Sequence, residues 1–96
     1  MNSLFYLFVL KTPNGYAFGE ITVRIDNGNI EGSIRISDQD GSYHGDLNGG
    51  TIKVSGTLAL KEERIPFVGE GRISCHAIHL TIPTEHFTYE LDGTAR

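Results

Sequence analysis

Apolar and polar residues alternate along most of this chain, and the apolar positions keep one parity within each of a series of short segments. From residue 19 to residue 60 that parity holds isoleucine, valine, leucine and tyrosine, and it also holds Gly19, Gly32, Gly45 and Gly56. Because successive side chains of a strand point to opposite faces, a constant parity predicts strands that share one buried face.

Dipeptides that favour tight turns separate these segments: Asn27-Gly28, Asp40-Gly41 and Gly49-Gly50. They tolerate the positive φ angles of two-residue hairpin turns, whose twist matches that of the strands they join. A turn at residues 27 and 28 would place Ile25 opposite Ile30, so that apolar residues face each other across the hairpin. The segments are therefore predicted to pair as consecutive antiparallel hairpins.

The alternation over the whole chain predicts eight strands, at residues 3–11, 16–25, 29–37, 42–48, 51–60, 65–74, 77–82 and 87–93. A meander with one apolar face must close into a barrel or fold over as a sandwich, and glycines on the inner side favour the sharp bending that closure needs. We predict an all-β protein with a single domain over residues 1–96. Its eight-stranded antiparallel up-and-down meander closes into a small β-barrel, which is round, flattened or partly open.

Two other architectures use a similar pattern. A β-solenoid would suit the recurring glycines, but it does not place hairpin dipeptides between its coils. An outer-membrane barrel would turn the apolar face to lipid and would need aromatic girdles, which this sequence lacks. It would also enclose a set of charged side chains: Arg24, Glu31, Arg35, Lys53, Glu70 and Arg72. The barrel with an apolar interior is therefore the favoured prediction.

Residues 4–10 are continuously apolar and could be mistaken for the core of a signal peptide. No basic leader precedes them, no small-residue cleavage site follows them, and a membrane-spanning helix would need about 20 apolar residues. We interpret them as part of the first strand, and the missing signal favours a cytoplasmic location.

The charge balance limits the class of partner. Lysine and arginine number 8 against 12 acidic residues, which gives a net charge of −4, and no basic run occurs. Nucleic acids and anionic membranes attract concentrated positive charge, so neither is an expected partner. The single cysteine, Cys75, excludes an internal disulfide framework.

The first strand departs from simple alternation because both of its faces are apolar. If Tyr6 and Phe8 face the core, a group of apolar side chains faces outward: Phe5, Leu7, Val9 and, from the second strand, Phe18. Contiguous outward apolar residues indicate a partner surface, unless a bulge or another segment covers them. We predict an interface for self-association, most simply as a dimer, and an acidic surface that suits a basic protein partner.

The predicted barrel interior contains three tyrosines: Tyr6, Tyr43 and Tyr89. Inward glycines remove side-chain volume, and the tyrosine hydroxyls could orient a small apolar ligand. The opposing interpretation is that glycine lets the walls approach and that the core is simply packed, as small eight-stranded barrels usually are.

Residues capable of binding metal gather near the C-terminal end of the sequence: Cys75, His76, His79 and His86. Their spacing matches no compact zinc pattern, and on one regular strand Cys75 and His79 would lie about 13 Å apart. Surface histidines near a turn explain them, so no metal or other cofactor is expected.

Catalysis is the least supported class of function, because no nucleophile or phosphate-binding motif occurs and most carboxylates lie on the outward parity. The leading prediction is a non-enzymatic interaction protein that self-associates through its first strand and binds another macromolecule. The alternative is a carrier of small apolar ligands. An enzyme centred on His76, His79 and His86 is a third hypothesis, and it would require bound metal.

Overall fold

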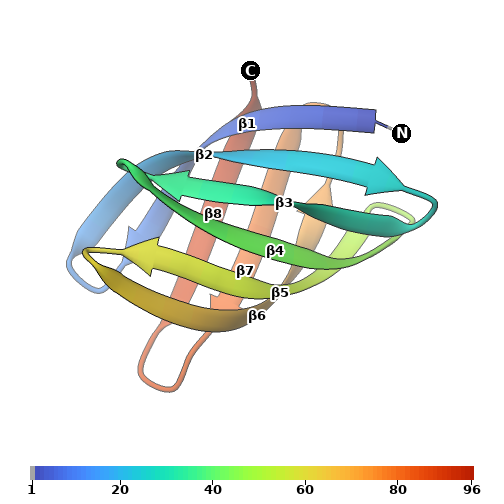
Figure 1. The fold of residues 1–96 in the computed structure, drawn as a ribbon. Helices are drawn as coiled ribbons and strands as arrows, with labels where there is room; N and C mark the ends of the chain where they lie inside the picture. The colour runs from blue at the N-terminus through green and yellow to red at the C-terminus, as the bar shows by residue number, and fades with distance from the viewer. Residues whose placement is uncertain (1) are drawn as a thin grey trace.

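The fold of this chain is an eight-stranded antiparallel barrel, seen in a computed structural model that describes residues 2–96 (Figure 1). The strands follow one another as β1 (Asn2–Thr12), β2 (Gly15–Asp26), β3 (Asn29–Ile36), β4 (Gln39–Asn48), β5 (Thr51–Leu60), β6 (Glu63–Ile73), β7 (Ala77–Pro83) and β8 (Thr88–Ala95). Each strand pairs with the next, and β8 pairs with β1. The predicted all-β meander and its closure are confirmed.

Closure depends on β1, which is paired along both of its edges. On one side it pairs with β2 from Asn2↔Ile25 to Thr12↔Gly15, and on the other with β8 from Tyr6↔Ala95 to Lys11↔Glu90. The barrel is closed, and its principal extents of 35 × 26 × 17 Å make it flattened. Within residues 2–96 every strand has a partner on both sides, although β6 pairs with β7 only over Glu70–Ile73. Paired edges give other chains little template for aggregation.

The predicted buried face lies inside the barrel. Its buried side chains come from every strand: Tyr6, Leu10, Ile21, Val23, Ile30, Ile34, Tyr43, Ile52, Leu58, Phe67, Leu80, Ile82 and Leu91 among others. The charged side chains that an outer-membrane barrel would enclose, such as Arg24 and Lys53, are exposed on the outside. Antiparallel hairpins likewise exclude a solenoid. Within the described residues, no helix is long and apolar enough to cross a membrane.

Inward glycines let the backbone of a neighbouring strand pass closely. A Cβ atom on Gly32 would lie 1.8 Å from the Thr22 carbonyl oxygen, and one on Gly45 would lie 1.9 Å from that of Lys53. Because real Cβ atoms do not approach an oxygen so closely, only glycine fits at these two positions. The glycines at these positions are required by the close approach of the neighbouring backbone, and their role in bending the strands stays a prediction.

The predicted turn at Asp40-Gly41 is wrong. The chain turns at Ser37 and Asp38, and both Asp40 and Gly41 are already paired within β4, opposite Arg35 and Ile34. Gly41 is buried, and a Cβ atom there would lie 1.9 Å from the Thr57 carbonyl oxygen. The glycine is needed for close approach of β5, a requirement that its neighbours in the sequence do not reveal.

Other predicted boundaries also shift. The connection expected over residues 61–64 is only a two-residue turn, in which Lys61 and Glu62 both have positive φ, and β6 begins at Glu63. The last strand starts one residue later than predicted and runs to Ala95, so Phe87 lies in the turn before β8. Strand pairing continues until the chain must reverse, and local composition does not mark that point.

Candidate functional site

The most exposed apolar surface lies on the outer face of β1 and β2. Its members, called the outer strip below, have these exposed fractions: Phe5 52%, Leu7 50%, Val9 37%, Tyr16 66% and Phe18 68%. Val9 lies directly opposite Phe18 across the two strands. The structure therefore brings the predicted interface residues together on one continuous face. Tyr16 was not predicted, although it has the outward parity of Phe18.

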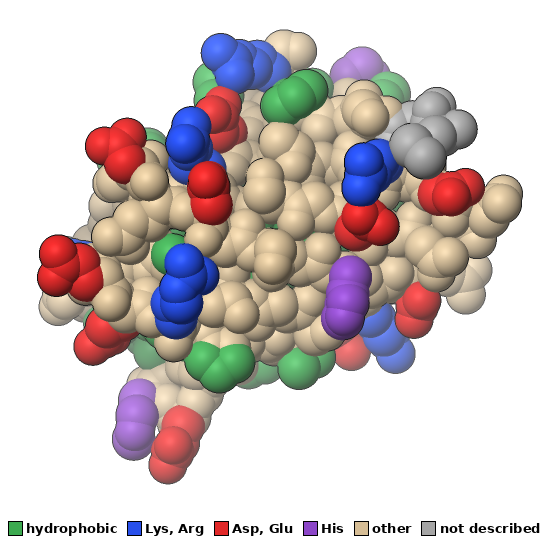
Figure 2. All heavy atoms as spheres, in the orientation of Figure 1, with side chains coloured by type: hydrophobic (Ala, Val, Ile, Leu, Met, Phe, Trp, Pro, Cys, Tyr) green, Lys and Arg blue, Asp and Glu red, His purple; other side chains and the backbone are tan. Residues whose placement is uncertain are grey.

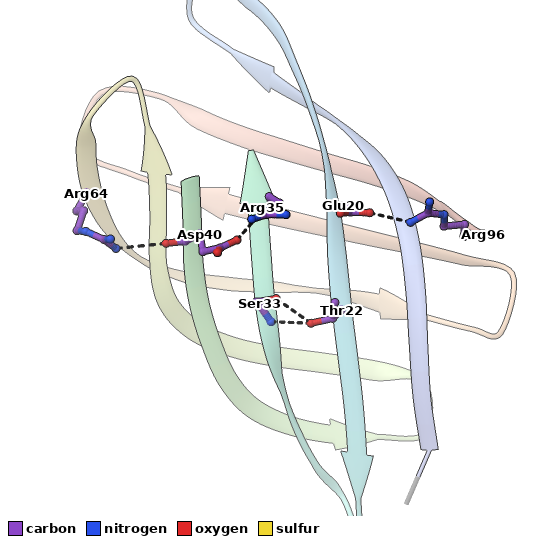
Figure 3. A network of polar contacts seen from close by, with 7 residues as sticks. All are labelled: Glu20, Thr22, Ser33, Arg35, Asp40, Arg64 and Arg96. Carbon is purple, nitrogen blue, oxygen red and sulfur yellow. Dashed lines mark hydrogen bonds and ion pairs between the residues drawn. The ribbon is translucent and has the colours of Figure 1, made fainter. Parts of the chain in front are cut away.

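Polar and charged residues border the outer strip. The backbone N–H of Arg96 donates to the Phe5 carbonyl at 3.0 Å, and its guanidinium contacts the Glu20 carboxylate at 2.9 Å. Figure 3 shows this ion pair with Arg96 and Glu20 on either side of β1. On the β8 side, Asp92 is paired with Val9. An apolar centre within a charged border resembles the anatomy of protein interfaces.

Inside the barrel, the hydroxyls of two of the predicted ligand-binding tyrosines are bound to the protein itself. The Tyr6 hydroxyl donates to the Ser74 carbonyl, and the Tyr43 hydroxyl donates to the Thr22 carbonyl at 2.7 Å. Burial raises the pKa of both phenols above the ordinary value of 10.0, so both remain neutral donors. A ligand in the interior would have to compete for these hydroxyls.

The third tyrosine lies apart from the other two. Tyr89 is half-buried near the β7–β8 turn, where its ring meets that of Phe87 edge to face at 5.1 Å between centroids. Ser74, the acceptor for Tyr6, follows β6 at the opposite end of the barrel. The structure therefore does not gather the three predicted residues into one group, and their role in ligand binding stays a prediction.

The end of the barrel near Ser74 has an apolar groove of about 440 Å³. Half-buried aliphatic residues from four strands line it: Leu4, Ile25, Leu47 and Ile73. The exposed thiol of Cys75 stands at its edge. Sequence reasoning did not single out this site, although each of the four residues is the last apolar one at its end of a strand.

A larger and more polar groove, of about 730 Å³, crosses the outer face from β1 to β5. Hydroxyl side chains lie along it: Thr22, Ser33, Ser42 and Thr57. In Figure 2, which views this side of the molecule, charged side chains stand on either side of a central uncharged stretch. The groove is also lined by the charged or ionisable side chains of Arg24, Glu31 and His44, so it does not consist of hydroxyls alone.

Two of the histidines that lie close in the sequence stand apart in the structure. His86 is exposed on the β7–β8 turn, 4.0 Å from its neighbour Glu85, whereas His79 faces outward in β7 and bonds Asp92 of β8. Over residues 2–96, no group of three or more His, Cys, Asp or Glu residues is arranged to hold a metal ion. His79 and His86 lie apart, and the enzyme hypothesis centred on His76, His79 and His86 stays a hypothesis.

Comparisons with known proteins bear on the fold. No protein-family model and no curated protein sequence matches this chain. Among solved structures, the chain is similar to a redesigned β-barrel, mFAP1, bound to DFHBI, with a TM-score of 0.66. The match covers 96% of this chain and 91% of the other, at 16% sequence identity. At that identity the similarity shows a shared barrel fold and nothing more specific.

Proposed function

We propose that this chain is a non-enzymatic interaction protein that associates with a second copy through the outer strip. The observation that carries the proposal is the run of large apolar side chains, each at least 37% exposed, on two paired strands. Leaving such a surface in water costs free energy that a partner would recover. The rest of the outer surface is largely polar and charged, so the outer strip is the preferred place for contact.

The charges around the outer strip support a second copy as the partner. If two copies pack with antiparallel β1 strands centred on Leu7, Phe5 of one copy meets Val9 of the other. The same rotation brings Arg96 of one copy toward Asp92 of the other, where Arg96 would exchange its contact with Glu20 of its own chain for one with that carboxylate. A two-fold contact of this kind is self-complementary in both apolar surface and charge.

Native mass spectrometry of the double variant Phe5→Ser, Val9→Ser tests this proposal. We expect a dimer for the unaltered protein and a single chain for the variant. The matched control is Val68→Ser, because Val68 is 66% exposed on β6, away from the outer strip. All three proteins should keep the same circular dichroism spectrum. An unaltered protein that is a single chain at the highest practical concentration would exclude self-association.

A second candidate function is binding of a small apolar ligand at the end of the barrel near Ser74. Two observations favour it: the groove lined by Leu4, Ile25, Leu47 and Ile73, and a protein of the same fold that was designed as a barrel and is bound to the small molecule DFHBI. The comparison with solved structures supports this candidate rather than self-association. The packed interior directs the ligand to the open end, away from the buried tyrosines.

Thermal denaturation with a panel of small apolar and aromatic compounds, DFHBI included, tests the second candidate. A ligand at one hundred times its Kd stabilises a protein by about 2.7 kcal/mol, which is easily detected as a rise in Tm. Leu47→Gln should abolish the rise, and Val68→Ser should preserve it. If no compound raises Tm, the groove has no role in binding ligands of this class.

A further inference from the structure

The strands β6 and β7 diverge after a short ladder. They pair only from Glu70↔Thr81 to Ile73↔Ile78, whereas β6 pairs with β5 over residues 63–72. In Figure 1 the first half of β6 and the β7–β8 hairpin run in clearly different directions. Within the part of the chain that the structure describes, the first half of β6 therefore has a strand partner on one side only, and its other edge is free.

Backbone hydrogen bonds at the end of β6 show which residues face this free edge. The Ile73 N–H donates to the Gly50 carbonyl at 2.8 Å, on the β5 side. The Ser74 N–H donates to the Ala77 carbonyl at 2.9 Å, on the β7 side. Because successive residues of an antiparallel strand bond neighbours on opposite sides, odd-numbered residues of β6 bond toward β5 and even-numbered residues bond away from it. The free edge therefore consists of the backbone groups of three residues: Arg64, Pro66 and Val68.

A proline stands in the middle of this edge. Pro66 has no N–H to donate, and a ring carbon takes the place of the hydrogen that would point toward an added strand. Arg64 and Val68 lie on either side of it, and all three residues are exposed. Proline and charged residues on a free strand edge are means by which proteins prevent pairing with another chain.

The edge of β7 that faces β6 also carries a proline. The Thr84 N–H donates to the Phe87 carbonyl at 2.8 Å, so even-numbered residues of β7 bond toward β8 and odd-numbered residues bond toward β6. Pro83 is the next odd-numbered residue after Thr81, where the ladder with β6 ends. The chain has three prolines, and two of them stand where β6 and β7 diverge, whereas Pro13 lies in the turn between β1 and β2.

We infer that Pro66 prevents two copies of this chain from joining edge to edge through β6. An antiparallel pair centred on residue 66 of both copies would be two-fold symmetric, and it would place Arg64 of one copy opposite Val68 of the other. At the centre, the two residues at position 66 would have to exchange a pair of N–H···O bonds, and proline supplies neither N–H. The free edge of β6 is a self-complementary surface that the proline keeps from pairing.

Sedimentation velocity of the variant Pro66→Thr over a range of protein concentrations tests this inference. Threonine restores the N–H and favours a strand without adding a large apolar side chain to the surface. The variant is made in the background Phe5→Ser, Val9→Ser, so that association through the outer strip does not contribute. We expect the association constant to rise about tenfold or more relative to that background, because two hydrogen bonds at the centre of the pair are regained.

The matched control is Pro13→Thr in the same background, which removes a proline from a turn and should leave the association constant unchanged. Adding Val68→Lys to Pro66→Thr should return the association constant to that of the background. The new lysine would lie opposite Arg64 of the second copy, and like charges directly opposite each other destabilise a strand pair.

Circular dichroism shows whether each variant keeps the fold. If Pro66→Thr does not, Pro66→Ala takes its place, because alanine restores the same N–H with a smaller side chain. The inference is overturned if the folded variant associates no more tightly than the background, if Pro13→Thr raises the association constant equally, or if Val68→Lys does not reverse the rise.

Discussion

Tyr43 connects three strands through a single hydroxyl. It extends from β4 past Gly32 of β3, where a Cβ atom would lie 2.9 Å from the phenol oxygen, and donates to the Thr22 carbonyl of β2. At this point the Ser33 N–H donates to the Thr22 hydroxyl at 2.9 Å (Figure 3). Side chains here satisfy backbone groups that a regular ladder would pair with each other.

The substitution Tyr43→Phe should destabilise the protein at pH 7 by about 1 kcal/mol, because it leaves the half-buried Thr22 carbonyl without its protein donor. Urea unfolding followed by circular dichroism measures the effect. Tyr16→Phe is the control, since Tyr16 is 66% exposed and should change stability by less than about 0.5 kcal/mol. Equal stability of Tyr43→Phe and the unaltered protein would show that the hydrogen bond contributes nothing net.

Alkaline pH should weaken the fold through the same residue. Burial raises the pKa of Tyr43 above 10.0, so the folded state retains a proton that the unfolded chain releases. The contribution of the Tyr43 phenol to the free energy of unfolding is fully present below pH 10 and is lost as the pH rises further. The stability difference between the unaltered protein and Tyr43→Phe should therefore narrow above pH 10. The same unfolding experiment checks this, and a constant difference would contradict it.

At the scale of the strands, inward glycines allow neighbouring strands to approach closely. At some inward glycines the nearest neighbour is the backbone of an adjacent strand, and at others it is a side chain. Beside Gly45 the nearest atom to an added Cβ would be the Lys53 carbonyl oxygen, whereas beside Gly69 it would be Cγ1 of Ile82 at 3.1 Å. Side chains can shift by a few tenths of an ångström more easily than a paired backbone can.

Gly45→Ala should therefore cost more than about 3 kcal/mol and Gly69→Ala distinctly less, within the range of about 1–3 kcal/mol for overpacking. Thermal and urea unfolding of the two variants measure the difference in the free energy of unfolding. Both glycines are inward-facing strand residues, so replacing glycine by alanine changes the intrinsic strand propensity equally at the two positions. Equal costs at the two positions would show that the close backbone approach at Gly45 does not limit the packing.

For the whole molecule, the decisive contact is that between its first and last strands. Leu91 of β8 lies opposite Leu10 of β1 on one side and Leu80 of β7 on the other, and all three side chains are fully buried. An open sheet would leave β8 paired on one side only. The burial of Leu91 therefore depends on closure of the barrel.

Leu91→Ala should cost about as much as Leu58→Ala, roughly 2–5 kcal/mol, because both leucines are fully buried. Leu58 lies on β5, within consecutive hairpins, and its burial does not require β1 to meet β8. Parallel denaturation curves of the two variants provide the comparison. A cost for Leu91→Ala well below that for Leu58→Ala would show that the contact between β1 and β8 is weak.

Much of this architecture could be predicted because strand parity is a local property. Ile25 faces Ile30 as expected from the turn at Asn27-Gly28, and the outward position of Phe5 follows from that of Tyr6. The turn at Ser37 and Asp38 could not be predicted, because the Asp40-Gly41 dipeptide resembles a turn sequence but contains glycine for a different reason. That glycine accommodates the backbone of β5, a strand more than ten residues away in sequence.

The sequence by itself determined which side chains point inward, the order of the hairpins and the apolar character of the outer face of β1. Only the tertiary structure decided the lateral neighbours that the turn dipeptides do not fix. Val9 meets both Phe18 and Asp92, and His79 meets Asp92, because strand register and closure of β8 on β1 place them together. Alternation repeats every two residues and fixes a face, whereas lateral contacts join residues far apart in the chain and depend on the whole barrel.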